Sequence, residues 1–129
     1  MKIIDAKNTV LGRLASFAAK EALRGEEIAV LNSEKVIITG NMKFIKEDFE
    51  AKKTRVGSNQ QGPKVSRSPY LIVRRAIRGM LPNHRTGRGR VAMKKIKCYV
   101  GIPKEFEGKK TIKIEHDQKN KFVILGEVK

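Results

Sequence analysis

Residues 2–32 read "KIIDAKNTVLGRLASFAAKEALRGEEIAVLN", and this stretch decides the fold class because it predicts a strand, a helix and a second strand in succession. The helix is expected between its N-cap, which is Asn8 or Thr9, and Gly25, which follows its last turn. The run "IAVLN" is continuously apolar rather than alternating, which is typical of a strand covered on both faces. This order of elements predicts a parallel sheet with right-handed crossovers.

Further strands and a second helix extend this α/β pattern along the chain. The run "VIITG" at 36–40 predicts another strand covered on both faces. The segment 41–55 predicts an amphipathic helix whose apolar face contains Phe44, Ile45 and Phe49. Later strand candidates are "CYVG" at 98–101 and two weaker runs at 111–116 and 121–125. The 129 residues fit a single domain spanning 1–129.

A third helix is predicted after segment 55–68, which has no hydrophobic periodicity and reads as a long loop. Ser68 is the expected N-cap of this helix and Pro69 its first residue. The apolar side is expected to consist of Ile72, Val73, Ala76, Ile77 and Met80. The opposite side carries three arginines within an arc of about 100°, namely Arg74, Arg75 and Arg78. A short helix is predicted at 90–97.

The positive charge of the chain is concentrated in its middle. The net charge is +16, yet residues 1–50 carry 8 Lys or Arg against 8 acids, and residues 105–129 carry 6 against 5. Residues 51–104 carry 15 Lys or Arg and no Asp or Glu. Solvated faces normally mix both signs because this limits self-repulsion. A central region without carboxylates therefore predicts a polyphosphate partner.

The segment "GMLPNHRTGRGR" at 79–90 contains a pattern that resembles a dinucleotide fingerprint, GxGxxA at Gly87, Gly89 and Ala92. Such a fingerprint needs a buried strand immediately before it and an acid about 20 residues later for the ribose. The preceding "PNHRT" is polar, and Glu105, the nearest acid, follows a separate strand. We therefore interpret the glycines as sites of positive φ or of close backbone approach to a phosphate chain, with no cofactor.

The sequence gives little support to metal binding, catalysis or membrane insertion. Cys98, His84 and His116 are too far apart to form a recognisable ligand set, and no serine has a histidine and a glycine elbow beside it. Cys98 is expected to be a buried, reduced thiol, which suits the cytoplasm. No stretch approaches the roughly 18 apolar residues that span a bilayer, and no export signal is indicated.

The kind of nucleic acid can be narrowed from the side chains available. Tyr70 is the one aromatic residue between Lys52 and Lys97, so stacking of splayed bases is not the main mode of recognition. Arginine dominates, and its planar fork suits phosphate contacts, so folded RNA read through its backbone and shape is the expected target. A helix-turn-helix DNA-binding protein stays open, although the turn is too long. A basic amphipathic helix on an anionic membrane is a weaker alternative, and a dinucleotide-binding enzyme is another.

Several blocks in this order resemble the ribosomal protein L13 family of the large subunit: "LGRLASFAAKEALRG", "VLNSEKVIITG", "GPKVSRSP", "RRAIRGMLP" and "RTGRGRVAMKKIKCYVGIP". The resemblance covers residues 2–106, and "GPKVSRSP" and "VGIP" look like the archaeal and eukaryotic branch. It implies a three-layer α/β/α fold on a four-stranded parallel sheet with long basic loops. It also implies binding to large-subunit rRNA, neighbouring ribosomal proteins as partners, a location in the cytoplasmic ribosome, and no enzymatic activity. The tail from 107 to 129 is not assigned by the resemblance.

The charge map and the resemblance together predict an RNA-binding set. The resemblance carries over Arg13, Arg67, Arg74, Arg75, Arg78, Arg85, Arg88 and Arg90, with Gly79, Gly87 and Gly89 allowing backbone approach. The charge map adds Lys52, Lys53, Arg55, Lys64, His84, Lys94, Lys95 and Lys97. The expected mechanism is a nearly neutral, rigid α/β body whose basic half neutralises phosphates where rRNA helices meet.

Overall fold

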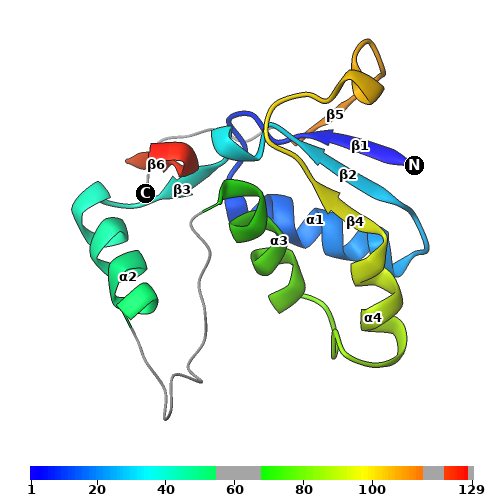
Figure 1. The fold of residues 1–129 in the computed structure, drawn as a ribbon, viewed down its shortest axis with the longest axis horizontal. Coiled ribbons are helices and arrows are strands. Elements are labelled where there is room, and N and C mark those ends of the chain that lie inside the picture. Colours follow the sequence, from blue (N-terminus) through cyan, green and yellow to red (C-terminus); the bar gives the residue numbers. More distant parts are fainter. Residues whose placement is uncertain (55–67, 115–120, 128–129) are drawn as a thin grey trace.

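The computed structural model describes residues 1–54, 68–114 and 121–127, and is built on a four-stranded parallel sheet (Figure 1). The strand order is β4-β2-β1-β5, and every neighbouring pair is parallel. The strands are β1 (Lys2–Asp5), β2 (Ile28–Leu31), β4 (Ile96–Cys98) and β5 (Ile112–Lys113). The predicted α/β class and four-stranded parallel sheet are confirmed.

Three helices cover one face of this sheet: α1 (Leu11–Leu23), α3 (Pro69–Gly79) and α4 (Gly87–Lys94) (Figure 1). The buried side of α1 is mostly alanine, so its backbone can approach the sheet and the neighbouring helices closely. Ile4 and Val30 from the sheet, Val73 and Ile77 from α3, and Ala92 from α4 join this core. Val73 and Ile77 therefore confirm the central part of the apolar side predicted for α3.

The second face of the sheet is covered by the connection from β4 to β5. This connection contains a short 3-10 helix, η3 (Lys104–Phe106), whose Phe106 packs with Ile3, Ala29 and Leu31. The rings of Tyr99 and Phe106 lie 5.4 Å apart between centroids. Every residue of β2 is consequently buried, as its unbroken apolar sequence predicts.

The strand expected from "VIITG" forms, but outside the four-stranded sheet. β3 (Ile37–Thr39) pairs antiparallel with β6 (Phe122–Ile124), and only Ile37 is fully buried, so the expectation of two covered faces is wrong. The cause lies upstream, where Asn32 adopts a left-handed conformation with φ of 57° and begins the 3-10 helix η1 (Ser33–Lys35). This turn directs the chain away from the four-stranded sheet, so β3 does not join it, and β5 is the fourth strand instead.

Two helix boundaries also differ from expectation. α1 begins at Leu11 with Val10 as its N-cap and no side-chain cap, because the Thr9 carbonyl accepts a hydrogen bond from the Ile37 amide at 2.9 Å and Val10 bridges to Ile37. α4 begins at Gly87, three residues before the predicted start at 90, and β4 begins at Ile96, two residues before the predicted 98–101. Side-chain periodicity alone does not place these ends.

Two apolar side chains predicted to be packed are exposed. Phe44 of α2 (Met42–Thr54) is 75% exposed, although Ile45 and Phe49 on the same helix are buried and half-buried. Met80, just after α3, is 46% exposed. In both cases the helix docks through a stripe narrower than the set of apolar residues that it carries. A further 3-10 helix, η4 (Leu125–Glu127), follows β6 and buries Leu125.

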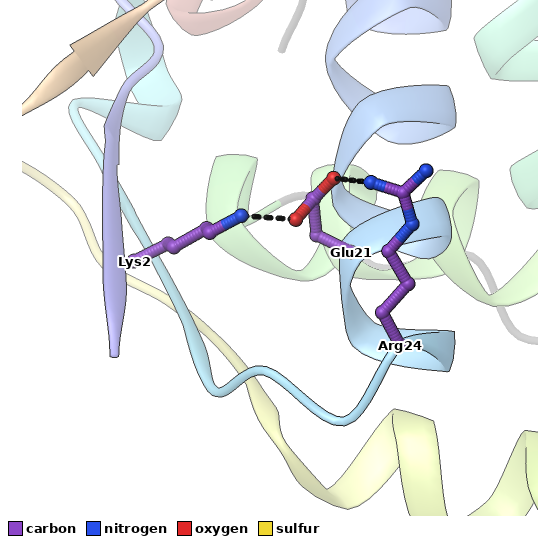
Figure 2. Close-up of polar contacts among 3 residues, drawn as sticks. All are labelled: Lys2, Glu21 and Arg24. Carbon is purple, nitrogen blue, oxygen red and sulfur yellow. Dashed lines mark hydrogen bonds and ion pairs between the residues drawn. The ribbon is translucent and has the colours of Figure 1, made fainter.

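A buried carboxylate joins α1 to β1, and no local sequence pattern predicts it. The Glu21 side chain is 6% exposed and forms ion pairs with Lys2 and, at 3.0 Å, with Arg24 (Figure 2). The hydrogen bond from Lys2, opposed by burial and helped by the charges of both cations, lowers the pKa of Glu21 below its ordinary 4.5. The ionised carboxylate therefore stabilises the folded state above pH 4.5, and this contribution is lost as pH falls through the lowered pKa.

Glu21→Gln is expected to lower the free energy of unfolding at pH 7, because Lys2 and Arg24 lose their anionic partner. The difference from the wild-type chain should shrink as pH falls below 4.5, where the carboxyl group of the unfolded chain becomes protonated, and vanish as pH falls through the lowered pKa of the native carboxylate. Urea unfolding at pH 7 and pH 3.5 measures both effects. Glu27→Gln, at an exposed position, is the control and should change stability little at either pH. Equal destabilisation by Glu21→Gln at both pH values would contradict the role given to the ion pairs.

Candidate nucleic-acid interface

Helix α3 presents arginines outward because the opposite side is anchored in the core. Pro69 occupies its first turn, preceded by Ser68 in an extended conformation. Val73 and Ile77 are fully buried, four residues apart on the packed side. The three arginines of the predicted cationic side, Arg74, Arg75 and Arg78, are all exposed. The helix thus has one docked and one cationic face, as its sequence predicts.

The loop between α3 and α4 is held by local hydrogen bonds. The Asn83 side chain accepts a hydrogen bond from the Arg85 amide at 3.1 Å and donates one to the Thr86 hydroxyl at 3.0 Å. Leu81 is buried in the main core and fixes the start of the loop. Arg85 is exposed and His84 is half-buried. These contacts give the loop a defined backbone conformation, and the exposed Arg85 side chain extends from it.

The three glycines of this region have different structural roles. Gly87 has φ of +61°, which favours glycine and agrees with the predicted positive φ. Gly89 is buried within α4, and a Cβ placed there would collide with the backbone carbonyl oxygens of Pro82 and Asn83. Gly79 has no neighbour within 4 Å of such a Cβ. The close approach at Gly89 is thus made by the protein's own loop, and its contact with phosphate stays a prediction.

Helix α4 adds exposed cations to those of α3 and the loop. Arg88, Arg90 and Lys94 are exposed, while Ala92 packs in the core. From Ser68 to Lys94 the chain has no Asp or Glu. We call the exposed cations of this segment the acid-free surface; its members are Arg74, Arg75, Arg78, Arg85, Arg88, Arg90 and Lys94. α3 and α4 lie on the same side of the sheet (Figure 1).

Other predicted residues lie apart from this surface or have structural contacts. The Lys95 ammonium donates a hydrogen bond to the Gly25 carbonyl at 3.1 Å, just past the end of α1. Lys97 is in register with Ala29, whose side chain packs against Phe106, so Lys97 faces the side of the sheet opposite α3 and α4. Lys52 and Lys53 lie on α2, where Lys52 pairs with Asp48 at 3.0 Å. The remaining predicted residues Arg55, Lys64 and Arg67 lie outside the described residues.

The Cys98 thiol is influenced both by burial and by the positive charge of Arg74 in the acid-free surface. Burial raises the pKa of its thiol to about 12, and the positive charge of Arg74 opposes this shift. The thiol is therefore protonated at neutral pH, which disfavours nucleophilic or metal-binding roles. Within residues 1–54, 68–114 and 121–127, no three His, Cys, Asp or Glu side chains cluster as metal ligands. None of the helices described is both long and apolar enough to cross a bilayer.

Residues 1–105 match the family model described as Ribosomal protein L13. The chain belongs to the ribosomal protein L13 family. It is 47% identical over 132 residues to the large ribosomal subunit protein uL13 of Methanosphaera stadtmanae, covering 98% of this chain and 92% of that protein. It is 52% identical over 105 residues to uL13 of Methanopyrus kandleri, covering 81% and 65% of the two chains. It is 42% identical over 123 residues to uL13 of Thermoplasma volcanium, covering 95% and 89%.

Membership of the L13 family confirms the resemblance seen in the sequence, including its archaeal character, since these relatives are archaeal. The L13 family consists of ribosomal proteins rather than enzymes, in agreement with the expectation that the chain is not an enzyme. The alignment with the Methanosphaera protein covers nearly the whole chain, so it extends into the tail after Glu107 that the sequence blocks left unassigned.

One cation beside the acid-free surface was missed by sequence analysis. Ser16 of α1 donates a hydrogen bond to the Met80 sulfur at 3.6 Å, which places this side of α1 against the end of α3. Arg13 and Lys20 are exposed and, at 100° per residue, lie within about 60° of Ser16 on the helix. Arg13 was predicted from the L13 resemblance and Lys20 was not. The i, i+3, i+7 spacing of Arg13, Ser16 and Lys20 is the signal that identifies it.

Proposed function

We propose that the protein binds and organises large-subunit rRNA through the acid-free surface, as a structural constituent of the large ribosomal subunit. The observation that carries this proposal is that seven exposed cations, contributed by two helices and their connecting loop, stand in a segment without any carboxylate. Facing water, these charges would repel one another, whereas an array of phosphates neutralises them and releases bound counterions. The names of the relatives, all large-subunit proteins, support the same partner.

The geometry of the surface favours recognition of the RNA backbone. Arginine supplies six of the seven cations, and its fork can bind two phosphate oxygens at once. Tyr70, at the start of α3, is the one aromatic side chain in segment 68–94, so base stacking contributes little. The α1 cations Arg13 and Lys20 extend the surface beside Met80. A rigid body that neutralises neighbouring phosphates would hold rRNA segments together during subunit assembly.

The alternative of a helix-turn-helix protein is not favoured by the arrangement of α3 and α4. Seven residues, 80–86, separate the two helices, whereas that motif uses a turn of about three or four. The alternative of a dinucleotide site is not favoured either, because a polar loop rather than a buried strand precedes Gly87. In addition, the backbone of α4 at Gly89 packs directly against this loop. A location in the cytoplasmic ribosome fits the family.

Ultraviolet crosslinking in cell extract, followed by sequencing of the nucleic acid bound to the purified chain, tests the proposal. We expect large-subunit rRNA to be the main product, with crosslinked peptides from residues 68–94. Enrichment of duplex DNA would favour the helix-turn-helix alternative. Absence of any RNA crosslink, in a chain that sediments apart from the large subunit, would contradict the proposed function.

A further inference from the structure

Helix α2 is attached to the rest of the protein along a narrow apolar stripe. Ile45 is buried against Val123 of β6, and Phe49 and Ile38 pack against the same pair. α2 lies beside β3 and β6, toward the left in Figure 1, whereas α4 lies toward the right. Most of the circumference of α2 therefore faces away from the core, at a distance from the acid-free surface.

The outward side of α2 combines an exposed aromatic ring with two carboxylates. Phe44 is 75% exposed, the most exposed large apolar side chain of the described residues. At 100° per residue, Glu47, Asp48 and Ala51 lie within about 60° of Phe44 around the helix, and all three are exposed. Among the described residues of α2, this arc contains no Lys, Arg or His. We call these four residues the Phe44 face.

The chemistry of the Phe44 face does not suit RNA or a second copy of the chain. Glu47 and Asp48 would repel phosphates, in contrast to the cations of α3 and α4. A two-fold contact between two copies would place the same carboxylates opposite each other, between chains that each carry a net charge of +16.

Within helix α2, one lysine already contacts both an aromatic ring and a carboxylate. The Lys52 ammonium lies 5.8 Å from the centre of the Phe49 ring and 3.0 Å from an Asp48 carboxylate oxygen. A cation thus sits over an aromatic ring and beside an acid, one turn along from Phe44. Both Lys52 and Asp48 are about half exposed, so this ion pair is weak and leaves Asp48 able to accept a second cation. Phe44 offers a second ring, with Glu47 and Asp48 on either side of it.

We propose that the Phe44 face binds a lysine- or arginine-rich segment of a neighbouring ribosomal protein. A cationic side chain of that segment lies over the Phe44 ring, and Glu47 and Asp48 pair with it and with the next cation. The inference rests on the proposed function, because the ribosome supplies the basic neighbour. Different elements of the molecule then bind partners of opposite charge: the cations of α3 and α4 bind RNA, and the Phe44 face of α2 binds a basic protein segment.

The test places a photoreactive residue, p-benzoylphenylalanine, at position 44 of the full chain, which is then assembled into large subunits in cells. Irradiation of the purified subunits should join position 44 to a Lys/Arg-rich segment of another ribosomal protein, identified by mass spectrometry. The same photoreactive residue at exposed Glu50, about 120° away on α2, is the matched control and should label that segment at least fivefold less. Crosslinks to rRNA, to a second copy or to nothing would each overturn the inference.

A charge-reversed chain tests the role of the carboxylates. Glu47→Lys with Asp48→Lys, in the chain carrying the photoreactive residue, should lower the crosslink yield at least fivefold, and Glu47→Lys with Glu50→Lys should lower it less. Unchanged yield with both acids reversed would overturn the charge pairing. Crosslinking of residues 68–94 to rRNA in the same subunits reports the proposed function separately. A chain that enters subunits and contacts rRNA, yet gives no protein crosslink at position 44, defeats this inference alone, whereas a chain absent from subunits defeats both.

Discussion

Gly89→Ala is expected to destabilise the protein strongly, because the added methyl group has no space in the structure. A Cβ at Gly89 would collide with the carbonyl oxygens of Pro82 and Asn83, and these are backbone atoms that cannot move aside by a rotamer change. Overpacking of a fixed interior typically costs 1–3 kcal/mol, so we expect a loss of about 3 kcal/mol from a total stability on the order of 5–15 kcal/mol. Thermal and urea unfolding followed by circular dichroism measure the loss.

The matched control is Gly12→Ala, which places the same methyl group on an exposed part of α1. No atom lies within 4 Å of a Cβ there. Alanine is a better helix former than glycine, so we expect a change between zero and a gain of about 1 kcal/mol. If Gly89→Ala were as mild as Gly12→Ala, the packing of the loop onto α4 would be refuted. Gly89 would then be free to serve as a site of backbone approach to phosphate alone.

The elements that local sequence determines were predictable. The strand, helix, strand order of residues 2–32 follows from unbroken apolar runs around an alanine-rich helix, and the structure has β1, α1 and β2 there. The two faces of α3 follow from helical periodicity, because Val73 and Ile77 must face the core. The concentration of cations between residues 51 and 104 is visible in composition alone. These features depend on residues close together in the sequence.

The features that depend on distant pairings were not predictable. β3 lies outside the main sheet and pairs with β6, more than eighty residues later. Lys97 faces away from the acid-free surface because the register of β4 with β2 sets its direction. Gly89 is required by a loop that folds back from Pro82 and Asn83, and Glu21 is buried because Lys2 reaches it from β1. Composition and periodicity contain no information about such contacts.

Arg74→Glu, Arg75→Glu and Arg78→Glu, combined in one chain, are expected to weaken binding to large-subunit rRNA by at least about 100-fold at 0.1 M salt. Each substitution replaces an exposed cation of α3 with an anion that repels phosphate. The buried side of α3, with Val73 and Ile77, is unchanged, so circular dichroism and thermal unfolding should show an intact fold. Filter binding to purified rRNA across a series of salt concentrations measures the affinity.

The control separates a local contact from a general effect of net charge. Lys35→Glu, Lys43→Glu and Lys46→Glu change the charge by the same amount at exposed positions on η1 and α2, outside the acid-free surface. Binding through the acid-free surface predicts that this control loses much less affinity. It also predicts that only the arginine variant loses about three from the slope of log affinity against log salt, since each phosphate contact contributes close to one. If both variants weakened equally, with equal slopes, the charge would act at long range and α3 would not be the interface.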